Sequence, residues 1–216
     1  MSRSTFSAIL IVLAVSVTAA LPAAAGDTFV SVGVLAGTTQ PDTDLANYRW
    51  DVGGQRAYGV QALLGRDRWG AGLRLFRWST SQSTGLLGFA DVPTVRLTSW
   101  QMFAQFRAVS LLGVRVLGSG SVGRVHLGYN PDQLILDDGV STPVVVDFKP
   151  LDEWMLGLGL GVERDLFSSL SVGAELERTY FSLDTAHQNG GVIEQNRESF
   201  GNWNLRLRLS WALRIA

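Results

Sequence analysis

The last segment of the chain alternates strictly between apolar and polar residues, and this period constrains the fold more than any other feature. One parity is apolar throughout, with Leu205, Leu207, Leu209, Trp211, Leu213 and Ile215, and the other holds Asn204, Arg206, Arg208, Ser210, Ala212 and Arg214. A β-strand places successive side chains on opposite faces, whereas a helix would scatter the arginines around its circumference. The period therefore predicts a strand with one apolar face and one arginine-bearing face.

The same period of two recurs in seven earlier segments of the chain. They cover residues 29–36, 57–64, 69–76, 100–108, 114–128, 154–163 and 170–177. In 114–128 the alternation is weakest, and we assign Val125 and Leu127 to the apolar outer face and Arg124 and His126 to the inner face. Together with the last segment, the pattern predicts eight strands.

The connections between these segments alternate between long and short. The long ones are 38–55, 79–96, 129–152 and 182–202, and the short ones are 66–68, 109–113 and 165–169. The long connections are rich in Pro, Asp, Asn, Ser and Gly, which are typical of polar loops. Long loops on one side and tight turns on the other are the pattern of an outer-membrane β-barrel, with both termini on the turn side.

The first 25 residues have the organisation of a secretory signal peptide. Arg3 precedes an apolar core from Ala8 to Leu21, which is shorter than the roughly 18–20 residues that a membrane-spanning helix needs. Pro22 ends this core and three alanines follow it, so we expect cleavage after Ala25. The domain organisation is then 1–25 signal peptide and 26–216 barrel. An uncleaved membrane anchor is the alternative.

The orientation of the two faces separates a membrane barrel from a lipocalin-like soluble barrel. A soluble barrel would point its apolar parity inward and carry many charges outside, whereas here the other parity is rich in Gly, Ala and Ser with few charges, which suits a narrow, filled interior. Five tryptophans share the apolar parity near strand ends and predict an aromatic girdle: Trp69, Trp100, Trp154, Trp203 and Trp211. Ordinary core tryptophans are the alternative.

These observations predict an all-β fold, an eight-stranded antiparallel up-and-down transmembrane β-barrel. Closure is required because an unpaired backbone group in hydrocarbon costs several kcal/mol. Basic and acidic residues number 18 and 19, so no basic excess favours nucleic acid as a partner. The chain contains no cysteine and only two histidines, so we expect no metal site and no cofactor.

The chain resembles the small OmpA/OmpX-like outer-membrane β-barrel superfamily over residues 28–216. The resemblance rests on the leader, the alternation, the loop asymmetry and the final segment LRLRLSWALRI. It departs from these barrels at the last residue, which is commonly aromatic and here is Ala216. The resemblance implies location in the bacterial outer membrane as a monomer. The implied partners are outer-membrane lipids, lipopolysaccharide and the barrel assembly machinery.

The inward parity carries a set of opposite charges. By parity these are Arg74, Arg107, Arg124, Glu163, Glu175, Glu177, Arg206 and Arg208. A buried charge without a partner is costly, so we expect a structural network of salt bridges that fills the barrel. A gate in a narrow pore is the alternative interpretation of the same residues.

Two further features of the sequence could form a functional site. Lipid A deacylases of similar shape use a histidine with a serine two residues later, but here His126 is followed at that offset by Gly128, so we expect no such catalysis. The loop 129–152 is acidic and lacks a regular calcium-ligand spacing. Its aspartates are Asp132, Asp137, Asp138, Asp147 and Asp152. We expect this loop to be solvated, with specific calcium binding as the alternative.

The sequence thus favours a non-enzymatic envelope protein, a rigid barrel that displays four extracellular loops for surface contact. A narrow small-solute channel or a lipid A-modifying enzyme is the alternative function.

Overall fold

The computed structural model describes residues 28–83, 93–136, 144–189 and 192–215. The expected signal peptide and its cleavage position after Ala25 lie outside these residues. Within the described part of the chain, no helix is long and apolar enough to cross a membrane.

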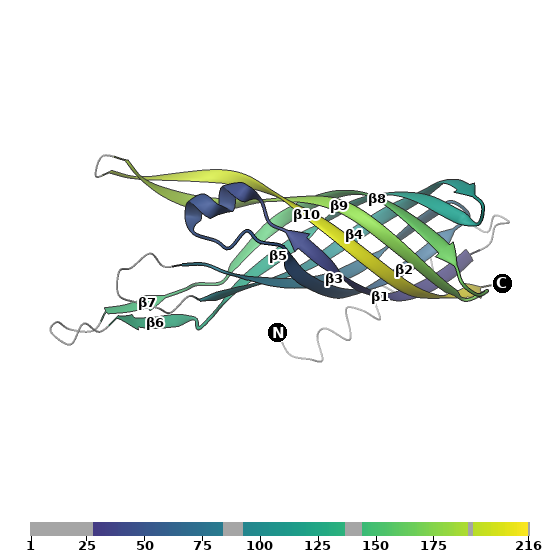
Figure 1. Ribbon diagram of the computed structural model, residues 1–216, viewed down its shortest axis with the longest axis horizontal. Coiled ribbons are helices and arrows are strands. Elements are labelled where there is room, and N and C mark those ends of the chain that lie inside the picture. Colours follow the sequence, from purple (N-terminus) through teal and green to yellow (C-terminus); the bar gives the residue numbers. More distant parts are fainter. Residues whose placement is uncertain (1–27, 84–92, 137–143, 190–191, 216) are drawn as a thin grey trace.

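Eight long strands form a closed antiparallel barrel (Figure 1). They are β1 (Thr28–Gln40), β2 (Gln55–Arg66), β3 (Trp69–Ser81), β4 (Thr94–Leu111), β5 (Val114–Asn130), β8 (Leu151–Asp165), β9 (Leu170–Asn189) and β10 (Val192–Ile215). Each strand pairs with its neighbours in the chain order of these eight, and β10 closes the ring by pairing with β1. The predicted eight-stranded up-and-down barrel is confirmed.

The strands are strongly tilted, because the register around the barrel is staggered. The stagger can be followed by stepping from Phe29 on β1 to its register partner on β2, and then from strand to strand around the barrel. This row of partners contains Gly65, Gly70, Gln105, Ser119, Gly159, Glu177 and Asn204. It returns to β1 at Thr39, ten residues after Phe29. A shear of this size accompanies a strand tilt of roughly 35–45°. Every residue of this row faces the interior, so one row supplies side chains at several depths of the barrel.

The short turns gather at one end of the barrel and the long connections at the other (Figure 1). At the short-turn end Asp67, Leu112 and Gly113 have positive φ, which closes two of the three turns. The C-terminal end of β10 lies at this same end. We call this end periplasmic and the opposite end extracellular, after the membrane orientation that the sequence predicts.

The long connections contain more regular structure than the sequence predicted. The first holds a 3-10 helix, η1 (Thr43–Tyr48), and the third holds a separate hairpin of β6 (Gln133–Leu136) and β7 (Val144–Asp147). The segment 182–202, which we expected to be a loop, is strand over its described residues. It continues β9 and β10 as a two-stranded ribbon beyond the barrel (Figure 1).

The outer surface of the barrel is apolar, as the alternation predicted. Side chains such as Val34, Leu158, Leu160 and Leu207 are exposed on the described surface. The inward parity of the same strands is mostly buried. A belt of exposed leucine and valine around a closed sheet is the surface that a lipid bilayer covers.

The interior consists of two layers. Toward the periplasmic end it is polar and charged, whereas toward the extracellular end buried apolar side chains fill it. The apolar layer includes Leu35, Phe76, Trp78, Val95, Leu97, Val125, Leu127, Met155, Phe181, Leu183 and Phe200, and Leu45 and Trp50 of the first long connection pack on it. We call this cluster the apolar plug. The sequence did not predict it.

The apolar plug corrects the orientation that we predicted for β5. Val125 and Leu127 are buried inside the barrel, while His126 is exposed on the outer face and Arg124 lies on that face too. Apolar residues on this strand therefore face the plug and not the lipid.

Candidate functional site

The centre of the barrel holds a compact cluster of four charged side chains. Nη2 of Arg74 lies 2.8 Å from Oε2 of Glu175, and Nη1 of Arg74 lies 3.4 Å from Oε1 of Glu177. Nη2 of Arg206 donates to Oε2 of Glu177. All four residues are buried, so each charge depends on the others for the interactions that water would otherwise provide.

A second cluster lies closer to the periplasmic end and shares one carboxylate between two arginines. Arg208 donates to Oε2 of Glu163, and Nη2 of Arg115 lies 2.7 Å from Oε1 of the same residue. Arg115 also donates to both carboxylate oxygens of Asp165. Arg115 and Asp165 were not among the predicted residues, although Arg115 occupies the inward parity between Val114 and Val116.

Small residues on β5 and β8 create the space for these carboxylates. Ser119 donates to Glu175 at 2.6 Å and Ser121 donates to Glu177 at 2.9 Å. A Cβ at Gly157 would lie 2.8 Å from Oε1 of Glu177. The small inward residues of β5 and β8 therefore leave room for the glutamate side chains of β9. In the described interior the charges balance, with three buried arginines and three buried glutamates.

Two of the predicted network residues lie elsewhere. Arg107 faces the interior at the periplasmic mouth, where its guanidinium lies 4.5 Å from the ring centroid of Phe29. Arg124 is on the outer face, 5.9 Å from the indole of Trp154, so its assignment to the interior network was wrong. The other six predicted residues form the two clusters described above.

The apolar plug separates the ion-pair clusters from the extracellular side. A cavity of about 10 Å³ lies where the plug meets the polar layer, lined by Trp78, Phe181, Gln101, Glu177 and other residues. One water needs roughly 10–15 Å³ of such volume. This cavity has room for about one water between the plug and the polar layer.

The five predicted girdle tryptophans are all exposed on the outer face, at two levels. Trp69 and Trp211 lie near the short turns, and Trp100, Trp154 and Trp203 lie toward the long connections. Arginines accompany the upper level: Arg124 pairs in register with both Trp100 and Trp154, and Arg178 pairs with Trp203. The remaining two tryptophans, Trp50 and Trp78, belong to the apolar plug.

The two other candidate sites do not assemble. Nδ1 of His126 lies 3.1 Å from Oδ1 of Asp152 on the exposed outer face, and Gly128 occupies the position of the missing serine. Of the acidic loop, Asp137 and Asp138 lie outside the described residues. Across all residues that the structure describes, no group of three or more His, Cys, Asp or Glu side chains is placed to bind a metal ion.

Comparison with known proteins identifies the fold. No protein-family model and no curated protein matches the sequence. Among solved structures, Neisserial surface protein A matches with a TM-score of 0.54 at 8% identity, covering 85% of this chain and 96% of that chain. The outer membrane protein AlkL matches with a TM-score of 0.52 at 16% identity, covering 91% and 96%. The chain therefore has the fold of the small eight-stranded outer-membrane β-barrels.

Proposed function

We propose that this chain is a non-enzymatic protein of the bacterial outer membrane that presents extracellular β-structure for contact with surface partners. The observation that carries the proposal is the ribbon formed by the ends of β9 and β10. β8 pairs with β9 only as far as Phe181, and β1 pairs with β10 only as far as Trp203. Beyond these residues β9 and β10 continue to pair with each other alone.

The ribbon is long enough to carry contacts away from the membrane. Its register runs over eight pairs, from Ser182↔Ser199 to Asn189↔Val192. At about 3.4 Å per residue this corresponds to about 27 Å along the strands. Figure 1 shows the ribbon extending past the end of the barrel, on the same side as the β6–β7 hairpin. Both would lie outside the cell.

The base of the ribbon is fixed to the barrel and to the first long connection. Arg197 lies 2.5 Å from Glu153 of β8 and 3.1 Å from Asp184 across the ribbon. The hydroxyl of Tyr48, at the end of η1, donates to Glu198 at 2.7 Å. A ribbon held at its base loses less conformational freedom when a partner binds than a free loop would.

The interior supports a non-conducting, non-catalytic role. The ion pairs of the polar layer and the apolar plug above it fill the barrel of the described chain. A hydrolase would need a nucleophile within hydrogen-bond reach of a base. His126 contacts a carboxylate, Asp152, and faces away from the interior. These observations weigh against the channel and the lipid A-modifying enzyme.

Lipopolysaccharide is the lipid partner that we propose for the outer face. Three outward arginines, Arg77, Arg124 and Arg178, lie beside aromatic residues toward the long connections. Arg77 is the register partner of Tyr58. The guanidinium of Arg178 lies 4.9 Å from the Trp203 ring and 5.3 Å from the Tyr180 ring. Aromatic contact holds such arginines at the interface, where they can bind phosphates. Because closure leaves no free sheet edge in the barrel, we propose a monomer inserted by the barrel assembly machinery.

Surface display is tested by shortening the ribbon. The full chain and a variant in which 184–197 is replaced by a two-residue turn are expressed in outer-membrane-bearing cells. Intact cells are then assayed for adhesion to immobilised extracellular-matrix proteins and cultured cell layers. We expect adhesion with the full chain and its loss in the variant, while both proteins keep a heat-modifiable band on gels.

Two outcomes would contradict the proposal. One is adhesion that is absent from the full chain or equal in the shortened variant. The other is steady current in planar bilayers, or release of acyl chains from lipopolysaccharide by the purified protein. A variant with Asp67 replaced by Asn in a periplasmic turn is the control, because it leaves the extracellular surface unchanged.

A further inference from the structure

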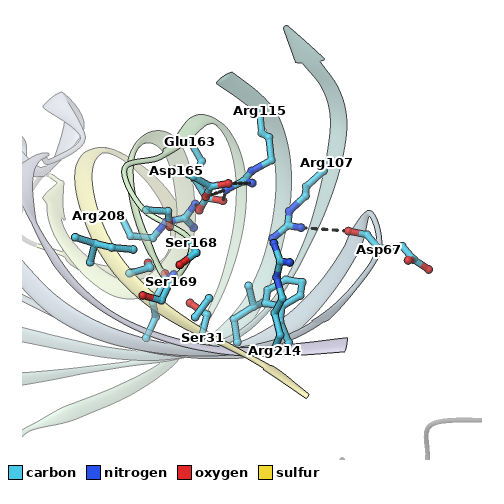
Figure 2. Close-up of a pocket in the computed structure, with 17 residues that line it drawn as sticks. Ser31, Asp67, Arg107, Arg115, Glu163, Asp165, Ser168, Ser169, Arg208 and Arg214 are labelled. Atoms are coloured by element: carbon cyan, nitrogen blue, oxygen red, sulfur yellow. Dashed lines mark hydrogen bonds and ion pairs between the residues drawn. The ribbon is translucent and has the colours of Figure 1, made fainter. Parts of the chain in front are cut away.

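The periplasmic mouth of the barrel contains an open polar pocket that surface contact does not use. Its volume is about 210 Å³, and it reaches from the turn residues Asp67, Ser168 and Ser169 inward to Gln61 and Ser210. Figure 2 shows Arg107, Arg115, Arg208 and Arg214 around it, together with Glu163 and Asp165. The pocket is thus rich in guanidinium groups and serine hydroxyls.

The carboxylates of this pocket are already occupied. Glu163 accepts from Arg115 and Arg208, and Asp165 accepts from Arg115 through both oxygens. These pairs balance Glu163 and Asp165 against two of the four arginines. The third carboxylate of the lining, Asp67, lies at the turn with its side chain 62% exposed, and its ion-pair partner among the described residues is Arg66, at 3.9 Å.

Two arginines of the pocket lie outside these ion pairs among the described residues, the exposed Arg214 and the partly buried Arg107. Nη1 of Arg107 donates to the backbone oxygen of Asp67 at 3.2 Å, and its guanidinium stacks on Phe29. Among the described residues, none of the ion pairs in this pocket includes Arg107. Glu163 and Asp165 act on Arg107 electrostatically from beyond ion-pair distance. A partly buried guanidinium that is held in place without an ion-pair contact can bind an anion directly.

The inner end of the pocket supplies an independent observation. Ser210 and Gln61 are only 2% and 5% exposed, and Ser210 Oγ and Gln61 Oε1 have no hydrogen-bond partner among the described residues. Both are register partners of Gly33, and a Cβ at Gly33 would lie 2.6 Å from Ser210 Oγ. The glycine therefore keeps a polar niche open, and buried polar groups of this kind normally have a partner.

We infer that this pocket binds inorganic hydrogen phosphate from the periplasm, which keeps a P–OH group near neutral pH. The guanidinium of Arg107 and the hydroxyls of Ser168, Ser169 and Ser210 donate to phosphate oxygens. Oε1 of Gln61 accepts from the P–OH group. One water occupies roughly 30 Å³ of liquid, so the pocket has room for the anion and several waters. Sulfate carries no proton near neutral pH and cannot satisfy Gln61.

The test uses the full chain folded in phosphate-free detergent micelles and titrated by calorimetry with inorganic phosphate and with sulfate. We expect saturable binding of one phosphate per barrel and at least tenfold weaker binding of sulfate. Arg107→Gln should weaken phosphate binding at least tenfold. Arg56→Gln removes an exposed arginine near the extracellular end of β2 and should leave binding unchanged.

Further arms keep the inference falsifiable if Arg107→Gln does not fold. Ser210→Ala and Arg107→Lys preserve the charge, and each should weaken phosphate binding several-fold. Vesicles of phosphatidylglycerol, a diester without a P–OH group, should not compete with phosphate. Absence of saturable binding, equal affinity in Ser210→Ala and the parent chain, or equal affinity for sulfate and phosphate would overturn the inference.

Discussion

Nη2 of Arg74 lies 2.8 Å from Oε2 of Glu175 at the centre of the barrel, with the two side chains 1% and 10% exposed. These residues come from strands on different sides of the closed sheet, β3 and β9. Their contact crosses the lumen and links two walls that share no backbone hydrogen bonds. The same is true of Arg74 and Glu177, so the polar layer braces the barrel from within.

Removing one member of this layer should be strongly destabilising. Glu177→Ala leaves Arg206 without its carboxylate and Arg74 with one partner in place of two. Breaking a buried ion pair from one side costs about 3–5 kcal/mol. Urea unfolding in micelles, followed by tryptophan fluorescence, measures the loss. Arg197→Gln, which removes an exposed ion pair, is the control and should change the midpoint little; equal effects of the two variants would contradict the bracing role.

Close approach of neighbouring strands makes one inward glycine irreplaceable. A Cβ at Gly37 would lie 1.9 Å from the backbone oxygen of Leu205 and 2.9 Å from Cα of Arg206. Gly37→Ala should therefore prevent closure or shift the β1–β10 register. The lipid-facing Gly118 has open space around its Cα, so Gly118→Ala should fold normally. The heat-modifiable gel shift compares them, and a fully folded Gly37→Ala protein would disprove this expectation.

The first long connection is held by the apolar plug and should detach when one of its side chains becomes charged. Leu45 is fully buried, and Leu45→Asp would place an unpaired carboxylate in the plug. We expect η1 to leave the mouth while the barrel stays folded. Trypsin should then cleave after Arg49 in intact cells. Protection equal to that of the parent chain would mean that the plug does not hold this connection.

Conductance should be close to zero and should not depend on the central carboxylates. Glu175→Gln and Glu177→Gln remove charge from the polar layer, but the apolar plug above it remains closed. Planar bilayer recordings of the parent chain and of the double variant should therefore be alike. A steady current that appears in the double variant would identify the two glutamates as a gate.

The outward arginines should matter only where anionic lipid is present. Arg178→Gln removes a guanidinium held between Trp203 and Tyr180. In micelles supplemented with lipopolysaccharide the parent chain should unfold at a higher temperature than the variant. In zwitterionic micelles alone the difference should shrink. An equal difference in the two media would indicate packing and not phosphate binding.

The alternation of apolar and polar residues was sufficient to predict the strands, their order and most of their inward faces. It failed on β5, because Val125 and Leu127 face an apolar plug inside the barrel. Hydrophobicity alone does not distinguish a side chain buried in lipid from one buried in protein, so Arg124 and His126 were assigned inward by default. Only the neighbours of Val125, such as Met155 and Leu97, resolve the difference.

The ribbon was missed for a different reason. Both faces of a ribbon in water are free to be polar, so residues such as Asp184 and Arg197 break the apolar alternation although they are in strands. Arg115 was missed because it shares the parity of Val125 and Leu127, which we assigned from the sequence to the outer face of this strand. The shared use of Glu163 depends on the register of three strands, because Arg115 is its partner on β5 and Arg208 reaches it from β10 across Gly173 of β9. The alternation fixes the face of each strand but not this register.

Insertions and deletions have different consequences in the barrel and in the ribbon beyond Phe181 and Trp203. Inside the barrel, a one-residue insertion in a strand would turn its lipid-facing side chains toward the interior and its interior side chains toward the lipid. In the ribbon, strands pair only with each other, so residues can be gained or lost in pairs with no effect on the wall. The length of the ribbon can therefore change in steps of one residue pair while the register of the barrel wall stays the same.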